Sequence, residues 1–354
     1  MNTIQLGSKK IDDSSLYFIA DIGANHNGSL DKALALIHLV KEAGADAAKF
    51  QNFQADKIVS KQGFEAMQGK MSHQSNWKKS VYETYKDASI SKDWTKQLKE
   101  ECDKVGLDYF TSPYDLESVD LVEPYVDLYK IGSGDITWLE IIDYIIAKGK
   151  PVLIATGASI MEDVERTMAF ASAKTKDLVL MQCNTNYTGS AENFKFCNLN
   201  VLKAYKQKYP DVVLGLSDHT SGHATVLGSI ALGARVIEKH FTDNNDQEGP
   251  DHGFAMNPQT WRDMVDRSYE LLSALGDGVK RVEPNEEQSK QVQRRCIRVN
   301  KNLSSGHTLV KDDLMVLRPI SENAYEPYDM EQLIGKTLTE DIDAGQHLTP
   351  STIN

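Results

Sequence analysis

The chain has 354 residues, 40% of them hydrophobic and 25% charged, an ordinary composition for a folded globular protein. Its 39 Lys and Arg residues against 51 Asp and Glu residues leave a formal charge of −12, which argues against a nucleic-acid-binding surface. It has no apolar run near the roughly 18 residues of a membrane span and no apolar signal segment, and its cysteines lack Cys-x-x-Cys spacing. We therefore expect a cytoplasmic protein that binds neither membrane nor nucleic acid, without a disulfide framework or a cysteine zinc site.

Short strand-like runs alternate with longer amphipathic segments along most of the chain. The predicted strands are residues 16–22, 46–50, 107–111, 127–131, 151–156, 178–182, 212–217 and 234–239. Between them, residues 29–44 and 91–106 each open on Ser, carry apolar residues at helical spacing and stop at Gly, as helices do. Apolar strands separated by helices indicate a parallel sheet covered by helices.

Eight such units match the count and size of a (β/α)8 TIM barrel. The competing architecture is a doubly wound open sheet. It is less favoured because no Gly-rich dinucleotide fingerprint follows the first predicted strand, and because eight units exceed its usual number. We predict a barrel domain over residues 1–276.

The pattern changes near residue 276. Residues 277–294 are polar and charged without core periodicity, which is typical of a linker or arm. Residues 295–354 are short β-like pieces broken by Gly, Asn and Asp, and predict a small β-rich second domain. So small a unit is marginal alone, and we expect it to pack against the barrel of its own or another chain.

Polar side chains follow almost every predicted strand, at the end where barrel enzymes carry their active sites. They are Asp21, Lys49, Gln51, Thr111, Ser112, Lys130, Ser133, Asp135, Asn184, Thr185, Tyr187, Ser217, His219 and His240. An arbitrary set of strand ends would be mixed and partly apolar. We interpret this set as the mouth of an active site.

Lys49 and Lys130 emerge from predicted strands, where a buried ammonium is costly unless an anion pairs with it. Together with nearby hydroxyls they could bind the phosphate and carboxylate of a substrate. Lys130 could instead form a Schiff base, as in a class I aldolase. Each lysine could also simply extend its ammonium to solvent. The residues themselves leave these alternatives open.

His219 and His240 follow two successive predicted strands. Most histidines at strand ends are only polar termini, but adjacent parallel strands lie about 4.8 Å apart, so both could reach one divalent ion. Two histidines leave positions open for water and substrate, which is typical of a Lewis-acid site. Asp251, in the loop after the last strand, could complete the site or bind a sugar hydroxyl. We interpret His252 as a solvated loop residue and His223 as a hydrogen-bonding residue at a helix start.

Six motifs, in this order, resemble the sialic acid synthases and their relatives that make legionaminic and pseudaminic acids. They are FIADIGANHNG, GADAAKFQ, YFTSPYDLESVDL, YKIGSGDIT, LSDHTSGHATVLGSIALGARVIEKHFT and GPDHGFAMNP. The resemblance continues through residues 295–354, which are similar to the antifreeze-protein-like SAF domain that ends these enzymes.

This resemblance implies the condensation of phosphoenolpyruvate with an aldose, usually an N-acetylated hexosamine, to give a nine-carbon 2-keto acid and phosphate. It implies a phosphoenolpyruvate site of Lys49, Thr111, Lys130, Ser133, Tyr187 and Ser217. It implies sugar contacts from Gln51, Asp135 and Asp251. His219 and His240 would bind Mn²⁺, with Mg²⁺ or Co²⁺ as alternatives. Arg318 would reach into the partner's active site in a domain-swapped homodimer.

The sequence departs from the family on the side of the sugar acceptor. Asp21, expected to move a proton, and Asp135 are each one methylene shorter than the family's glutamates. Thr185 stands where Asn or Ser is common, no proline follows Tyr187, and RPISENAYEPYDM replaces a glycine-containing segment after Arg318. We therefore expect a substrate-binding site, with Thr185 in it, whose acceptor differs from N-acetylmannosamine.

Two other functions remain as alternatives. A Schiff-base aldolase using Lys130 would work without metal and would be trapped by borohydride. A non-catalytic sugar-binding protein built around the C-terminal domain would have no use for lysines and histidines at the strand ends.

Overall fold

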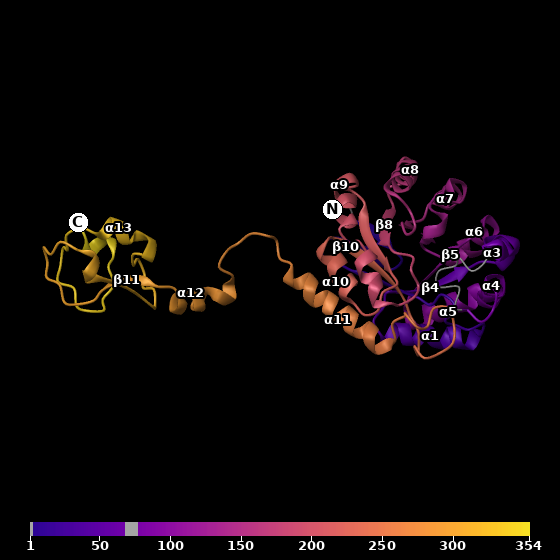
Figure 1. The fold of residues 1–354 in the computed structure, drawn as a ribbon, viewed down its shortest axis with the longest axis horizontal. Helices are drawn as coiled ribbons and strands as arrows, with labels where there is room; N and C mark the ends of the chain where they lie inside the picture. Colours follow the sequence, from indigo (N-terminus) through magenta and orange to yellow (C-terminus); the bar gives the residue numbers. More distant parts are fainter. Residues whose placement is uncertain (1–2, 68–76) are drawn as a thin grey trace. The chain divides into compact units, whose positions relative to one another are not determined.

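The computed structural model describes residues 3–67 and 77–354. The chain divides into two compact units, Met1–Gly276 and Asp277–Asn354, and each has its own hydrophobic core. In the first unit eight parallel strands close a barrel with helices around it (Figure 1). The prediction of a TIM barrel is therefore confirmed, and the open doubly wound sheet is wrong.

All eight predicted strands are present, with ends that differ by a few residues. They are β3 (Tyr17–Asp21), β4 (Ala47–Asn52), β5 (Asp108–Pro113), β6 (Tyr129–Ile131), β7 (Val152–Ala155), β8 (Leu178–Cys183), β9 (Val213–Asp218) and β10 (Ala234–His240). The barrel closes where β10 pairs with β3, with His240 opposite Asp21. These strands are buried along nearly their whole length, which explains their continuous apolar sequences.

In the described part of the chain, one main helix follows each barrel strand. These helices are α1 (Leu30–Glu42), α5 (Trp94–Val105), α6 (Leu116–Val122), α7 (Leu139–Ile146), α8 (Met161–Ser172), α9 (Val201–Lys208), α10 (Ala224–Ala231) and α11 (Pro258–Ala274). The Ser29 side chain caps α1 by accepting from the Lys32 backbone N–H, and left-handed Gly106 ends α5, as their sequences predicted. None of the helices in the described ranges is long and apolar enough to cross a bilayer.

The connection from β4 to α5 is the longest in the barrel, and it carries additional helices. These are α2 (Ala55–Ile58), α3 (Lys61–Ala66) and α4 (Val81–Ala88). A small apolar cluster holds them together, formed around Ala55, Val59 and Val81.

A hairpin that the sequence analysis missed lies at the amino ends of the barrel strands. It consists of β1 (Ile4–Leu6) and β2 (Lys9–Ile11). Its turn residue Gly7 has φ +51°, and a Cβ there would lie 2.1 Å from Asp108 Oδ2, so only glycine fits. The next residue, Ser8, donates its backbone N–H to the Asp108 carboxylate at the start of β5.

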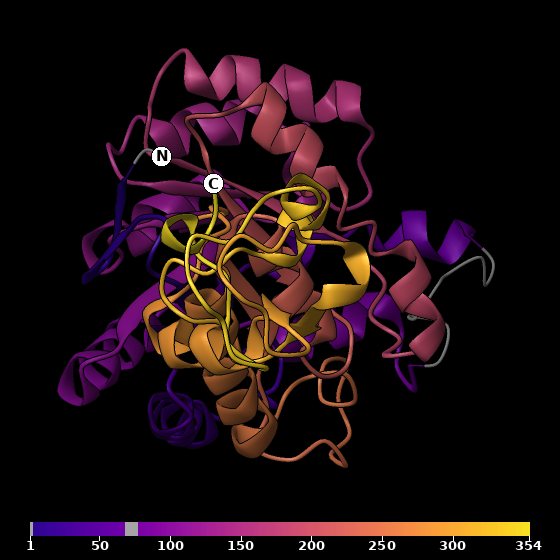
Figure 2. The same ribbon diagram turned by 90° about the vertical axis from the view of Figure 1, so that its left-hand side faces the viewer.

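The second unit is mostly irregular, with short elements around a small core (Figure 2). An antiparallel pair, β11 (Cys296–Val299) and β12 (Leu314–Leu317), is followed by α13 (Met330–Leu333). Its core is formed mainly by leucines and includes Ile297 and Leu348. The segment that precedes it is exposed and contains the short helix α12 (Glu287–Gln293).

Candidate active site

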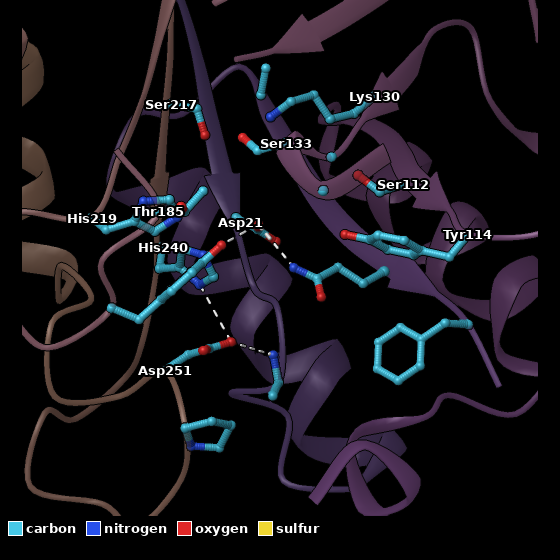
Figure 3. Close-up of a pocket in the computed structure, with 18 of the residues that line it drawn as sticks. Asp21, Ser112, Tyr114, Lys130, Ser133, Thr185, Ser217, His219, His240 and Asp251 are labelled. Carbon is cyan, nitrogen blue, oxygen red and sulfur yellow. Dashed lines mark hydrogen bonds and ion pairs between the residues drawn. The ribbon is translucent and has the colours of Figure 1, made fainter. Parts of the chain in front are cut away.

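A cavity of about 520 Å³ lies at the carboxyl ends of the barrel strands. Every barrel strand contributes to its wall. In order from β3 to β10, the contributing residues include Asp21, Lys49, Ser112, Lys130, Ala155, Cys183, Ser217 and Glu238. Figure 3 shows several of these side chains converging on the same space.

The cavity brings together most of the predicted site residues. Its lining includes Asp21, Lys49, Gln51, Lys130, Ser133, Asp135, Thr185, Tyr187, Ser217, His219, His240 and Asp251. Three predicted residues are not among those that line it: Asn184, Thr111 and Arg318. Arg318 belongs to the second unit, where its guanidinium donates to the Gln293 carbonyl, so its role in a partner's site stays a prediction.

Thr111 is buried but does not line the cavity. Its hydroxyl donates to Asn52 Oδ1 at 2.7 Å, and the Asn52 amide donates to Thr95 on α5 at 3.1 Å. Successive strand residues face opposite sides, so Ser112 is the one that points inward. Its Oγ is buried and has no hydrogen-bond partner in the described part of the chain. The structure thus places Ser112, rather than Thr111, at the cavity.

Lys49 and Lys130 meet a carboxylate that the sequence analysis did not single out. Lys130 Nζ lies 2.6 Å and Lys49 Nζ 3.9 Å from Glu238 Oε1, and Ser217 donates to the same oxygen at 3.0 Å. The Lys49 ammonium also forms an ion pair with Asp21. All of these side chains are nearly inaccessible to solvent. The floor of the cavity is therefore a compact cluster of two ammonium groups and two carboxylates.

The neighbouring charges favour the ionised forms of Glu238 and Lys49 despite their burial. Burial would raise the pKa of Glu238, but Lys130 and Lys49 outweigh it and lower that pKa to about 2. Burial would likewise lower the pKa of Lys49, yet Asp21 and Glu238 raise it. A signal for Glu238 existed in the sequence, because it stands two residues before His240 and so faces the same side of β10.

The rings of His219 and His240 face each other beside this floor, with centroids 5.4 Å apart. His219 Nδ1 lies 2.8 Å from the Asn184 carbonyl oxygen, which can only accept, so Nδ1 carries the hydrogen and Nε2 keeps its lone pair. Burial lowers the pKa of His219 to about 3, with a further contribution from His240. The Tyr187 ring packs on His219 with centroids 4.1 Å apart.

His240 lies between two carboxylates. Its Nε2 is 3.6 Å from Asp21 Oδ2, and its Nδ1 is 3.5 Å from Asp251 Oδ2. Burial would lower the pKa of His240, but these two charges raise it. Asp251 is fixed in turn by the Ala24 backbone N–H, at 3.0 Å. Figure 3 shows His219, His240 and Asp251 on one side of the cavity.

The two histidines have the chemistry of ligands for a divalent ion. Both rings are buried, and Nε2 of His219 keeps a lone pair that could bind an ion. Carboxylate oxygens lie beside His240. First-row divalent ions accept such a mixed set of nitrogen and oxygen ligands. Within residues 3–67 and 77–354, no group of three or more His, Cys, Asp or Glu side chains is arranged to hold a metal. The residues fit an ion bound by His219 and His240 that keeps other coordination positions open.

The wall opposite the histidines is aromatic. The Phe53 ring lies 5.5 Å from that of Tyr85 and 5.9 Å from that of Tyr114, and all three line the cavity. Tyr114 is seen across the cavity from His219 and His240 in Figure 3. Asp135 also lines this part of the site, where burial raises its pKa to about 6. The cavity thus has a charged floor, a side with imidazoles and a side with aromatic rings.

His252 differs from its prediction as a solvated loop residue. It is fully buried, with Nδ1 2.6 Å from Thr242 Oγ1 and Nε2 3.0 Å from Asn27 Oδ1. It therefore joins the loop after β10 to the loop after β3. His223 directly precedes α10, but its side chain makes no capping hydrogen bond to that helix.

Residues 36–280 match the NeuB family, and residues 294–354 match the SAF domain. The chain belongs to the sialic acid synthase family. It is 31% identical to the N,N'-diacetyllegionaminic acid synthase of Legionella pneumophila over 338 residues, which cover 94% of this chain and 93% of the relative. It is also 31% identical to the pseudaminic acid synthase of Campylobacter jejuni serotype O:2, over 342 residues that cover 95% and 96% of the two chains.

Among solved structures, this sialic acid synthase family member is similar to the N-acetylneuraminic acid synthetase of Leptospira borgpetersenii in complex with citrate. The TM-score is 0.72 and the identity 26%, with 81% of this chain and 95% of that chain covered. The family assignment confirms the resemblance recognised in the sequence motifs.

Proposed function

We propose that this protein condenses phosphoenolpyruvate with an aldose, an N-acetylated hexosamine or a related sugar, to a 2-keto-3-deoxy nonulosonic acid and inorganic phosphate. The observation that carries the proposal is the convergence of two buried lysines and two buried histidines on one cavity at the carboxyl end of the barrel. Membership in a family whose relatives are named as legionaminic and pseudaminic acid synthases supports it.

The charged floor is the proposed site of phosphoenolpyruvate. Lys49 and Lys130 would pair with its phosphate and carboxylate groups, and the hydroxyls of Ser112, Ser133 and Ser217 would donate hydrogen bonds. Lys49, Lys130 and Ser217 are already held in position by Glu238 and Asp21, and prearranged donors of this kind stabilise charge in a transition state. Tyr187 and Thr185, on the loop after β8, would close this part of the site.

The reaction forms a bond between C3 of phosphoenolpyruvate and the aldehyde carbon of the sugar. Water then adds to C2, and the bond from C2 to the phosphate oxygen breaks. A divalent ion held by His219 and His240, which we expect to be Mn²⁺, would polarise the aldehyde oxygen. Asp21, which lies beside Lys49 and His240, would accept the proton of the water and return one to the new hydroxyl.

The acceptor would lie between the imidazoles and the aromatic wall. Gln51, Asp135 and Asp251 would bind its hydroxyl and amide groups, and Phe53, Tyr85 and Tyr114 would pack against its apolar face. We further propose a homodimer in which the partner subunit's Arg318 enters this site, and a cytoplasmic location.

The Schiff-base aldolase is disfavoured by the contacts of Lys130. A Schiff base needs a neutral amine with room for a carbonyl, whereas the Lys130 ammonium is buried in an ion pair with Glu238. Borohydride treatment with substrates would give no covalent adduct under the proposed condensation.

The test is phosphate release from phosphoenolpyruvate with Mn²⁺, against a panel of aldoses. The panel contains N-acetylmannosamine, diacetamido-dideoxy hexoses, plain mannose and shorter sugars. We expect release with one acceptor and its loss with a chelator. Release that needs no acceptor or no metal would contradict the proposed reaction.

A further inference from the structure

A second pair of buried charges lies directly behind the two histidines, outside the cavity. Asp218 and Lys239 form an ion pair whose side chains are 5% and 1% exposed. They are cross-strand neighbours at the ends of β9 and β10. Asp218 immediately precedes His219, and Lys239 immediately precedes His240. Because successive residues face opposite sides, the histidines line the cavity while the ion pair faces the surrounding helices.

Hydrogen bonds extend this ion pair into the turn that carries His219. The hydroxyls of Thr220 and Thr225 each donate to Asp218 Oδ2 at 2.8 Å. The Lys239 ammonium also donates to the Thr220 backbone carbonyl at 2.6 Å. The residue before His240 is therefore bonded to the residues on both sides of His219.

Stability of the fold is a weak explanation for such a pair. Removing two charges from water costs about as much free energy as their attraction returns, so buried ion pairs can often be replaced by apolar residues without loss. An apolar pair, however, could not bond to the Thr220 carbonyl or accept from the two threonine hydroxyls. What the charges add is a fixed position for the ends of β9 and β10.

We infer that Asp218 and Lys239 are positioning residues that set the spacing of His219 and His240 and thereby the affinity for a divalent ion. This inference rests on the metal-binding role proposed for the two histidines. Side chains that hold metal ligands in place typically contribute about 10- to 100-fold to metal affinity.

The experiment measures Mn²⁺ binding to the full chain without substrates, by the loss of the free-ion EPR signal. The variant Asp218→Asn/Lys239→Met removes both charges together, so no unpaired charge stays buried. We expect its dissociation constant for Mn²⁺ to rise about 10- to 100-fold. The KM for phosphoenolpyruvate should change little, because Lys49 and Lys130 are untouched.

Lys9→Met is the matched control. It breaks the ion pair of Lys9 with Asp46, 2.8 Å long, at the opposite end of the same barrel. This variant should bind Mn²⁺ as the wild type does. A folded double variant with unchanged Mn²⁺ affinity would overturn the inference.

A milder variant covers the case in which the double variant does not fold. Thr225→Val keeps the volume and removes one hydrogen bond to Asp218, and should weaken Mn²⁺ binding by about fivefold. Unchanged affinity there would also overturn the inference. If instead the wild type binds no Mn²⁺, or binds it equally after His219→Ala, the proposed metal role itself fails.

Discussion

The polar groups described at the two ends of the barrel differ in whether their hydrogen bonds are satisfied. At the amino end, the Asp108 carboxylate accepts from the Ser8 backbone and from the Tyr17 hydroxyl at 2.7 Å. At the carboxyl end, Ser112 Oγ and Glu238 Oε2 are buried without a partner in the described residues. An unsatisfied buried polar atom destabilises a protein, and Ser112 and Glu238 both line the cavity, where a ligand can satisfy them. The contacts of Asp108 therefore stabilise the fold, whereas Ser112 Oγ and Glu238 Oε2 are available for binding.

The largest effect on activity is expected from replacing the two histidines at the carboxyl end. His219→Ala or His240→Ala should lower the rate of phosphate release by about a thousandfold, because the proposed metal site is lost. The thermal midpoint without metal should change little, since both rings border the cavity. A double alanine variant that stays active without metal would contradict the assignment.

The next effect concerns the charged floor. Lys130→Met combined with Glu238→Gln removes one ammonium and its 2.6 Å partner, leaving no unpaired charge. We expect kcat/KM for phosphoenolpyruvate to fall about 10²- to 10³-fold, because a prearranged charge contact to the substrate is lost. Steady-state kinetics with saturating sugar measures this. Unchanged kcat/KM would place the anion elsewhere in the cavity.

At the amino end the expected effect is on stability alone. Asp108→Ala leaves the hydroxyl of the buried Tyr17 without its acceptor, which should lower the free energy of unfolding by about 1–3 kcal/mol, whereas the exposed Ser8 N–H can bond to water. Urea denaturation of the barrel measures it. The KM for phosphoenolpyruvate should equal that of the wild type, and a substantial change in KM would show that the two ends are coupled.

The smallest effect is the pH dependence from Asp135, whose pKa is raised to about 6 by burial. The folded state favours the protonated carboxyl. The free energy of unfolding should therefore increase as the pH falls from about 6 to the ordinary pKa of an aspartate. The affinity for the sugar acceptor should instead decrease as the pH falls, because the Asp135 carboxylate becomes protonated below pH 6. We expect KM for the sugar to rise up to tenfold per pH unit there, and Asp135→Asn to remove that rise. A wild-type KM that is flat between pH 5 and 7 would exclude this role.

Continuous apolar runs predicted the barrel strands, because nearly every residue of a strand that is buried on both faces must be apolar. The hairpin of β1 and β2 escaped notice because each strand has only three residues, too few for a periodicity. The error at Thr111 has a related cause. Two neighbouring polar residues at a strand end do not reveal which one points inward, and the register of β5 decides it.

Glu238 was missed for a different reason. A single carboxylate in a strand-like run shows nothing of its partners, and Lys49 and Lys130 approach it from strands that are far away in the sequence. The acceptor side was the least predictable part, because Phe53 and Tyr85 are brought to the cavity by the long connection between β4 and α5 rather than by the barrel itself.

The Glu238 carboxylate has one more consequence. It serves as an internal counter-ion, so the charges of Lys49 and Lys130 are already balanced, with the help of Asp21, before any substrate arrives. An incoming anion must replace the Glu238 carboxylate in its contacts with both lysines. A singly charged buffer anion gains little from that exchange, whereas a molecule bearing a phosphate and a carboxylate can engage both ammonium groups at once. The site would thus favour anions that carry two charged groups over singly charged ions of the surrounding salt.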